Sequence, residues 1–146
     1  MKQQMSGTDP AKAVVTARVI HGAVMAGIVI IFAVFLYLRT QGAPEMAADT
    51  ARVLRILGYA MLVIPVFGSG VARGRIPTRR RGEDLAGWWA ANLNGAVVVW
   101  VLAEGGGLGA MVLGWLTGDT NLMALGAAVA LAVLFVNRPS RLQGET

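Results

Sequence analysis

The residue whose type and position most strongly suggest chemistry is Glu104. It is the only charged residue between positions 95 and 116, and four glycines occupy the five positions that follow it: Gly105, Gly106, Gly107 and Gly109. A charge at the centre of a membrane-length helix costs about 2.5–3.5 kcal/mol on insertion scales, and each glycine inside a helix adds about 1 kcal/mol relative to alanine. A carboxyl group kept at such a cost can tie helices together through a hydrogen bond, or it can carry a proton or a cation.

The second candidate is His21, the only histidine in a chain that has no cysteine. One histidine leaves a zinc site short of ligands and cannot form a bis-histidine haem site within one chain. Ala17 stands four residues earlier, and this Ala-x-x-x-His spacing resembles that of light-harvesting polypeptides that ligate bacteriochlorophyll. The two interpretations of His21 are a possible ligand to a bound pigment and a packed or interfacial histidine.

Sequence patterns typical of enzymes are absent. The chain contains no Ser-His-Asp set, no His-Glu-x-x-His motif and no Walker motif. A glycine-rich phosphate cradle needs a loop ahead of a helix N-terminus, whereas residues 105–109 lie inside an apolar run. The sequence therefore predicts a protein that is not an enzyme, with no cofactor and no metal site.

The composition indicates a membrane protein. Of the 146 residues, 55% are hydrophobic and 14% are charged, whereas soluble domains carry about 25% charged residues. The apolar residues form long continuous blocks, which are typical of spans through a bilayer. The net charge is +5, but the basic residues stand between the apolar blocks, which indicates membrane topology and no nucleic-acid partner.

The elements that must position these residues are four predicted transmembrane helices in one all-α domain, residues 13–138. They are expected at residues 13–38, 51–72, 85–116 and 121–136, between a polar N-terminal tail (1–12) and a C-terminal tail (139–146). Pro65 should disturb the second helix, and Ser69 one turn later can satisfy a freed backbone group. Four aromatic residues are predicted to anchor helix ends at the membrane interfaces: Tyr37, Trp88, Trp89 and Trp115.

The distribution of lysine and arginine predicts the orientation of the spans. The N-terminal part up to Arg18, the segment 73–81 and the C-terminal part from Arg138 onward hold ten of the thirteen basic residues, and the opposite side holds three. Because cytoplasmic segments carry the excess of basic residues, both termini are expected in the cytoplasm. The expected location is the bacterial inner membrane, with the segment from Arg73 to Arg81 in contact with anionic lipid headgroups.

Small residues recur every four positions on two of the predicted helices. Helix 85–116 carries the stripes Gly105 with Gly109 and Gly106 with Ala110 and Gly114; helix 13–38 carries Gly22 with Ala26 and Ala23 with Gly27. Such stripes let helix backbones approach closely, so we expect a tight contact between these two helices. Aligning Gly27 with Gly105 also pairs several apolar residues, which favours two helical hairpins related as parallel repeats.

Two resemblances follow from these residues. The run Leu-Ala-Glu-Gly-Gly-Gly-Leu-Gly, followed by a short fourth helix and Arg-Pro, resembles small uncharacterised bacterial four-helix membrane proteins, which implies the fold and no activity. Residues 95–136 have a weaker likeness to the proteolipid subunit c of rotary ATPases, in which a mid-membrane carboxylate binds the transported ion. In that family the glycine stripe and the carboxylate lie on different helices, whereas here both fall on helix 85–116.

The sequence thus predicts a non-enzymatic inner-membrane protein that works through helix packing, as a homo-oligomer or as an accessory subunit of a larger membrane complex. The residues expected at the helix contacts are Gly22, Ala26, Gly27, Gly105, Gly106, Gly109, Ala110 and Gly114. The alternative is translocation of a proton or a cation through Glu104, as the likeness to a proteolipid subunit implies.

Overall fold

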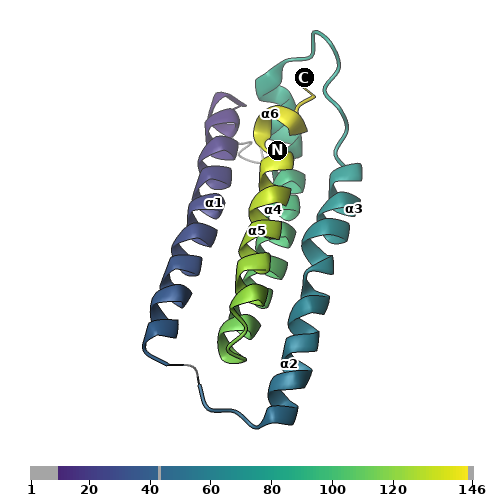
Figure 1. Ribbon diagram of the computed structural model, residues 1–146. Coiled ribbons are helices and arrows are strands. Elements are labelled where there is room, and N and C mark those ends of the chain that lie inside the picture. The colour runs from purple at the N-terminus through teal and green to yellow at the C-terminus, as the bar shows by residue number, and fades with distance from the viewer. Residues whose placement is uncertain (1–9, 43, 145–146) are drawn as a thin grey trace, which may run out of the picture.

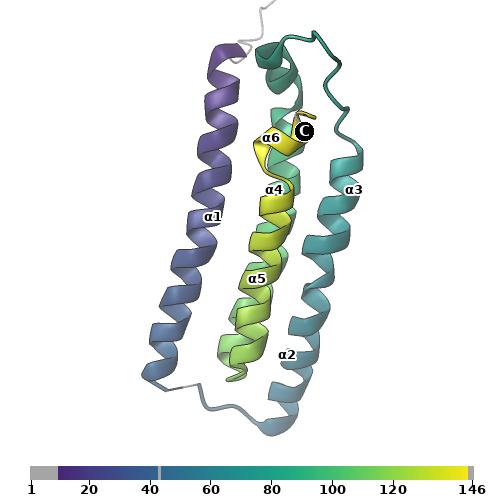
Figure 2. The same ribbon diagram turned by 45° about the horizontal axis from the view of Figure 1, so that its top comes forward.

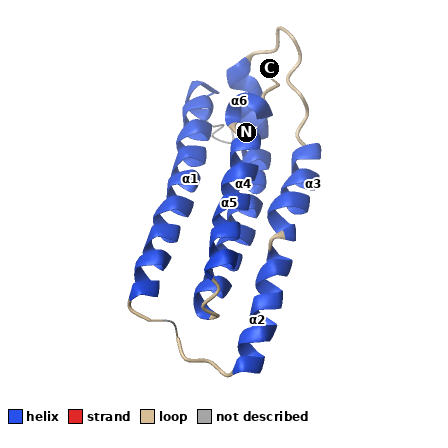
Figure 3. Cartoon of the chain, viewed as in Figure 1, coloured by secondary structure: helices blue, strands red, loops and turns tan. Residues whose placement is uncertain are grey.

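The computed structural model describes residues 10–42 and 44–144, and within them every regular element is a helix. The long elements are α1 (Pro10–Thr40), α2 (Ala48–Met61), α4 (Leu85–Leu116) and α5 (Thr120–Val136). A π-helical turn, η1 (Ile64–Gly68), and a short helix, α3 (Ser69–Gly74), continue α2, and α6 (Pro139–Leu142) follows α5. Figure 3 shows that loops only connect these helices. The predicted all-α class is confirmed.

Helix α4 is the centre of the fold. It packs most extensively against α5 and α1, and it also contacts α2, η1 and α3. Helix α1 and the arm formed by α2, η1 and α3 lie on opposite sides of the α4–α5 pair and make hardly any contact with each other (Figures 1 and 2). The expectation of two similar hairpins therefore needs correction, because only the second pair of helices packs together.

Pro65 changes the helical pattern of the second apolar segment, as predicted. It lies in η1, where the hydrogen-bond pattern widens to a π-helical turn, because proline has no N–H to donate to the preceding turn. Ser69 is buried and donates its hydroxyl to the carbonyl of Pro65. The serine thus supplies a donor to the irregular turn, which membrane helices require.

Three helical segments are long and apolar enough to cross a membrane: Lys12–Thr40, Ala48–Gly74 and Leu85–Leu116. The fourth apolar helix, Thr120–Val136, has 17 residues. Only 11% of the most apolar window of the first segment and 17% of that of the second are buried inside the structure, against 44% for the third. Exposed apolar surface of this extent is what lipid-facing helices present, which indicates a membrane protein.

One end of the bundle, termed here the α6 end, holds α6, the start of α1 and α4, and the end of α5 (Figure 1). The predicted C-terminal tail belongs to the bundle at this end, because Leu142 and Gln143 are buried. Asp84 and Asp119 cap α4 and α5, accepting hydrogen bonds from Gly87 N at 2.7 Å and Leu122 N at 3.0 Å. These caps place the start of α4 at Leu85, as predicted, and the start of α5 at Thr120, one residue before the predicted start.

Candidate functional site

Glu104 lies half-buried on the side of α4 that faces α1. A Cβ built on Gly27 of α1 would lie 3.8 Å from its Oε1 atom, an ordinary van der Waals contact, so the carboxyl group lies directly beside Gly27. Within residues 10–42 and 44–144, no side chain or backbone group bonds to Glu104. Helix packing alone therefore positions the carboxyl group. Its oxygens can still form hydrogen bonds with groups outside the described residues.

The predicted small residues of α4 and α1 divide into those packed against another helix and those left uncovered. The first group includes two glycines of α4 that pack against α5. A Cβ on Gly107 would lie 2.5 Å from the Cβ of Ala130 and 2.8 Å from the carbonyl oxygen of Gly126, both on α5. Gly114 also faces α5, and a Cβ there would lie 2.7 Å from Met123. The closest backbone contact of the bundle described here is thus between α4 and α5, not between α4 and α1 as predicted.

Two further glycines of α4 face the arm formed by α2 and η1. Gly106 faces the ring of Pro65, and a Cβ on Gly109 would lie 2.6 Å from the Sδ atom of Met61. These two glycines make room for the proline turn and for the end of α2. The prediction that they are packing residues fits this arrangement, but their partner is the α2–η1 arm.

The second set of small residues is uncovered. A Cβ on Gly105 or on Gly22 would meet no atom within 4 Å, and Ala26 is exposed. The predicted contact of Gly22 and Ala26 with α4 is not formed, because this stripe points away from α4. Of the small residues predicted to form the stripes of α1, Gly27 lies against α4, beside Glu104.

His21 is a packed residue at the α6 end. It is 7% exposed, its Nε2 atom lies 3.0 Å from the carbonyl oxygen of Leu134, and its ring meets Trp100 edge-on at 5.2 Å between centroids. A carbonyl only accepts, so Nε2 carries the proton. The burial of the ring, its contact with Trp100 and this hydrogen bond support the interpretation of His21 as a packed histidine.

The tryptophans predicted at one membrane interface lie in the core instead. Trp88 and Trp89 are 3% and 0% exposed, and Trp89 donates its Nε1–H to Gln143 Oε1 at 2.8 Å. At the opposite end, Trp115 stacks on Phe35 with ring centroids 5.7 Å apart. Tyr37, at 64% exposure, faces outward as predicted for an anchor.

Sequence reasoning missed Trp100, which joins three elements. It contacts His21 of α1 and donates its Nε1–H at 2.9 Å to the carbonyl of Asn137 at the end of α5. A tryptophan inside an apolar run gives no sequence signal of a specific partner. The structure shows that this residue helps to fix the position of α1 relative to α4 and α5.

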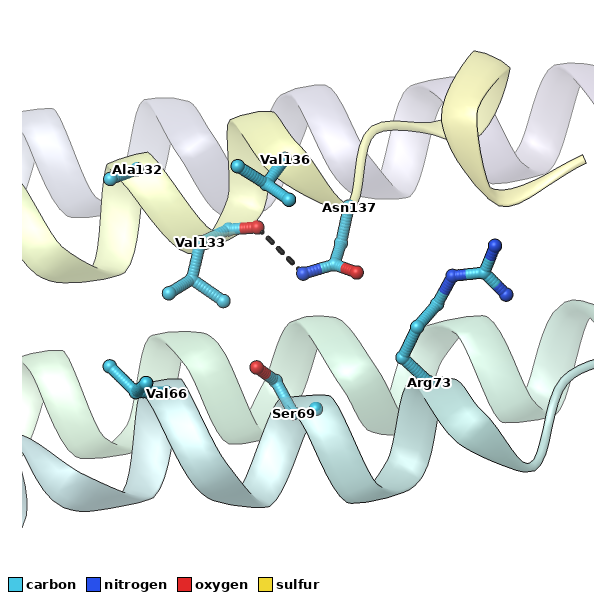
Figure 4. A pocket seen from close by; sticks show the side chains of 8 residues that line it. Val66, Ser69, Arg73, Ala132, Val133, Val136 and Asn137 are labelled. Carbon is cyan, nitrogen blue, oxygen red and sulfur yellow. Dashed lines mark hydrogen bonds between the residues drawn. The ribbon is translucent and has the colours of Figure 1, made fainter. Parts of the chain in front are cut away.

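A pocket of about 390 Å³, also not predicted, lies between the α3 side of the arm and the last turns of α5 (Figure 4). Its polar lining residues are Ser69, Arg73 and Asn137. The sequence predicts Ser69 only as a partner of the proline turn and Arg73 only as a headgroup contact. Residues so far apart in sequence carry no common motif, so no sequence pattern joins them.

The arm is tied to the opposite end of the bundle by an ion pair. Arg55 Nε lies 3.3 Å from Asp119 Oδ2, and Tyr59 donates its hydroxyl to the same oxygen at 3.4 Å. Among the described residues, no group of three or more His, Cys, Asp or Glu side chains could hold a metal ion. The polar groups described here therefore connect helices, and Glu104 stands apart from them.

Comparison of the chain with protein-family models, with curated proteins and with solved structures finds no match. The features that define the protein are accordingly those of its own structure: an all-helical bundle with three to four apolar helices that could span a membrane, and the Glu104 carboxyl group, which has no bonding partner among the described residues and lies next to the open Gly105.

Proposed function

We propose that the chain is a four-span inner-membrane protein of bacteria, with both termini in the cytoplasm, that is not an enzyme and acts by associating with a second membrane subunit. That subunit is either another copy of the same chain or a component of a larger complex. The position of the beginning of α1 and the end of α5 at the same end of the bundle supports an even number of spans. The ten basic residues of the terminal parts and of segment 73–81 support the cytoplasmic side.

The observation that carries this proposal is the open surface around Gly105. Gly105 has no atom near its missing side chain, and its neighbours on the same surface of α4, Val98 and Val101, are 51% and 54% exposed. Glycine is unfavourable in a helix unless the lack of a side chain is used. A helix of a partner subunit lying along α4 would use it, because a backbone can approach Gly105 closely.

Glu104 is adjacent to this surface and strengthens the proposal. Its carboxyl group has no bonding partner among the described residues, and a polar group inside the membrane is stabilised by a hydrogen bond across a helix contact. A partner helix at Gly105 would bring its own polar or backbone groups within reach of Glu104. The same contact would then account for both the glycine and the carboxyl group.

The test is a pair of matched leucine substitutions. Gly105→Leu fills the open surface of α4, whereas Ala60→Leu adds similar bulk to an exposed position of α2. The native mass in mild detergent, measured by light scattering, should fall for Gly105→Leu and stay unchanged for Ala60→Leu, with both variants helical by circular dichroism. An unchanged mass for folded Gly105→Leu would refute the proposed association.

The second candidate function is movement of a proton or a cation through Glu104. It is favoured by the half-buried, unpaired state of the carboxyl group at the middle of α4. Liposomes containing the protein should then conduct, and Glu104→Gln should abolish the flux. Labelling of Glu104 by a carbodiimide would support a protonated carboxyl, whereas the absence of flux in the wild-type protein would exclude this function.

A further inference from the structure

The pocket between the arm and α5 changes in character along its length. Its inner part is lined by aliphatic side chains: Val66, Ala132, Val133 and Val136. Its α6 end is lined by Asn137 and Arg73, and Ser69 lies between the two parts (Figure 4). An apolar pocket with one polar end is complementary to an amphiphilic ligand that has one charged headgroup.

The charge at the polar end is positive, and no described residue neutralises it. No acidic residue of the part of the chain that the structure describes lines the pocket. The guanidinium of Arg73 donates to the carbonyl oxygens of Ile76 and Arg141, both at 3.4 Å, and forms no ion pair within the described residues. These two long bonds leave most of its five N–H donors and its whole charge for an anion.

Asn137 adds a defined acceptor next to this charge. Its Nδ2 atom donates to the carbonyl of Val133 at 2.9 Å, so its Oδ1 atom is directed to the side of Arg73 (Figure 4). A ligand that fits this end therefore combines an anionic group for Arg73 with a hydroxyl or ammonium donor for Asn137. Phosphatidylglycerol has both features, an anionic phosphate and headgroup hydroxyls, whereas phosphatidylcholine has no headgroup donor.

We propose that this pocket binds one anionic phospholipid, with its phosphate on Arg73, the donor of its headgroup on Asn137 and an acyl chain along the valines. Charge complementarity selects the lipid, because basic pockets between membrane helices recognise anionic headgroups. The volume of about 390 Å³ holds only part of the lipid, and the rest of the chains extends into the bilayer. The proposal rests on insertion into a membrane, but not on the association through Gly105.

The experiment is native mass spectrometry of the full-length protein in detergent, titrated with phosphatidylglycerol or with phosphatidylcholine. One phosphatidylglycerol should bind with saturation, and phosphatidylcholine should bind at least about fivefold more weakly, since each basic residue near the headgroups contributes about 1 kcal/mol. Arg73→Gln should weaken the binding of phosphatidylglycerol by about the same factor. Arg80→Gln is the matched control, because Arg80 is an exposed arginine of the same connection that does not line the pocket.

A second variant tests the acyl-chain part without a change of charge. Ala132 is exposed at the pocket, so Ala132→Trp should fill the apolar part and displace the lipid while the protein stays folded. Equal losses of phosphatidylglycerol affinity for Arg73→Gln and Arg80→Gln would show a non-specific electrostatic attraction and would overturn the proposal. Equal binding of the two lipids to the wild-type protein would also overturn it. A fall in oligomeric mass with Ala132→Trp, at unchanged lipid binding, would assign the pocket to a protein helix instead.

Discussion

The α4–α5 pair and helix α1 are both apolar and rich in small residues, but they use these residues in opposite ways. In the pair, Gly107 and Gly126 bring the two backbones together, and a Cβ on either would lie 2.8 Å from the carbonyl oxygen of the other. On α1, Gly22 and Ala26 are exposed, and α1 is held by larger side chains such as His21. A small-residue stripe therefore marks a close contact only where the partner helix turns its own small residues toward it.

This difference divides the molecule into a rigid pair and two outer segments. Helices α4 and α5 are joined by a short capped turn and share a backbone contact, whereas α1 and the α2–η1–α3 arm pack on opposite sides of the pair. The outer segments expose most of their apolar side chains. The pair is the structural core, and the outer segments are the parts available for lipids or partner subunits.

The largest effect should come from disturbing the contact inside the pair. Gly107→Val places a branched side chain against Ala130 and the carbonyl of Gly126, and overpacking costs typically about 1–3 kcal/mol and occasionally more. Thermal unfolding in detergent should show a strongly lowered midpoint. Gly22→Val, at an open position of α1, is the control and should leave the midpoint nearly unchanged; similar losses in both variants would contradict the distinction between the two regions.

A smaller effect is expected where α1 meets the pair. Trp100→Phe keeps an aromatic ring near His21 but removes the hydrogen bond from Nε1 to the carbonyl of Asn137. A buried hydrogen bond of this kind contributes about 0.5–1.5 kcal/mol, and an unsatisfied buried partner about 1–3 kcal/mol. The free energy of unfolding should therefore decrease by about 0.5–3 kcal/mol. Limited proteolysis should release α1 earlier than α5. Simultaneous release of both helices would show that Trp100 does not act on α1 specifically.

The smallest effect should come from the ion pair that ties the arm to the α4–α5 turn. Arg55→Gln removes the contact with Asp119 but leaves the cap that Asp119 provides for α5. The Arg55 side chain is 46% exposed, so the pair should contribute less than about 1 kcal/mol. The loss should disappear at high salt, where the ion pair of the wild-type protein is screened; a salt-independent loss would indicate a packing role for Arg55.

The sequence predicts the helices well because each has local signals. Asp84 and Asp119 cap α4 and α5, and the irregular turn predicted at Pro65 is present with Ser69 as its donor. The helix partners were harder to predict, since a stripe of glycines does not say which helix faces it. The rotation of α1 about its axis, which turns Gly22 outward and Gly27 toward Glu104, depends on the whole bundle.

The functional residues show the same limit. Glu104 stands out in any reading of the chain, because a charge in an apolar run has a large energetic cost. Trp88 and Trp89 were assigned to an interface, although an amphipathic ring fits equally well inside a polar end of the core, where Gln143 accepts a bond from Trp89. Arg73 and Asn137 meet only through the packing of α3 on α5, which no local pattern encodes.

The most direct test of the proposed association uses the absence of cysteine from the chain. A single cysteine introduced as Gly105→Cys lies on the open surface of α4, and Ala60→Cys is the exposed control on α2. Oxidation in native membranes should cross-link Gly105→Cys efficiently to a second copy or, through a bifunctional reagent, to one defined partner, and should leave Ala60→Cys as a monomer. A monomeric Gly105→Cys protein under both treatments would contradict the account.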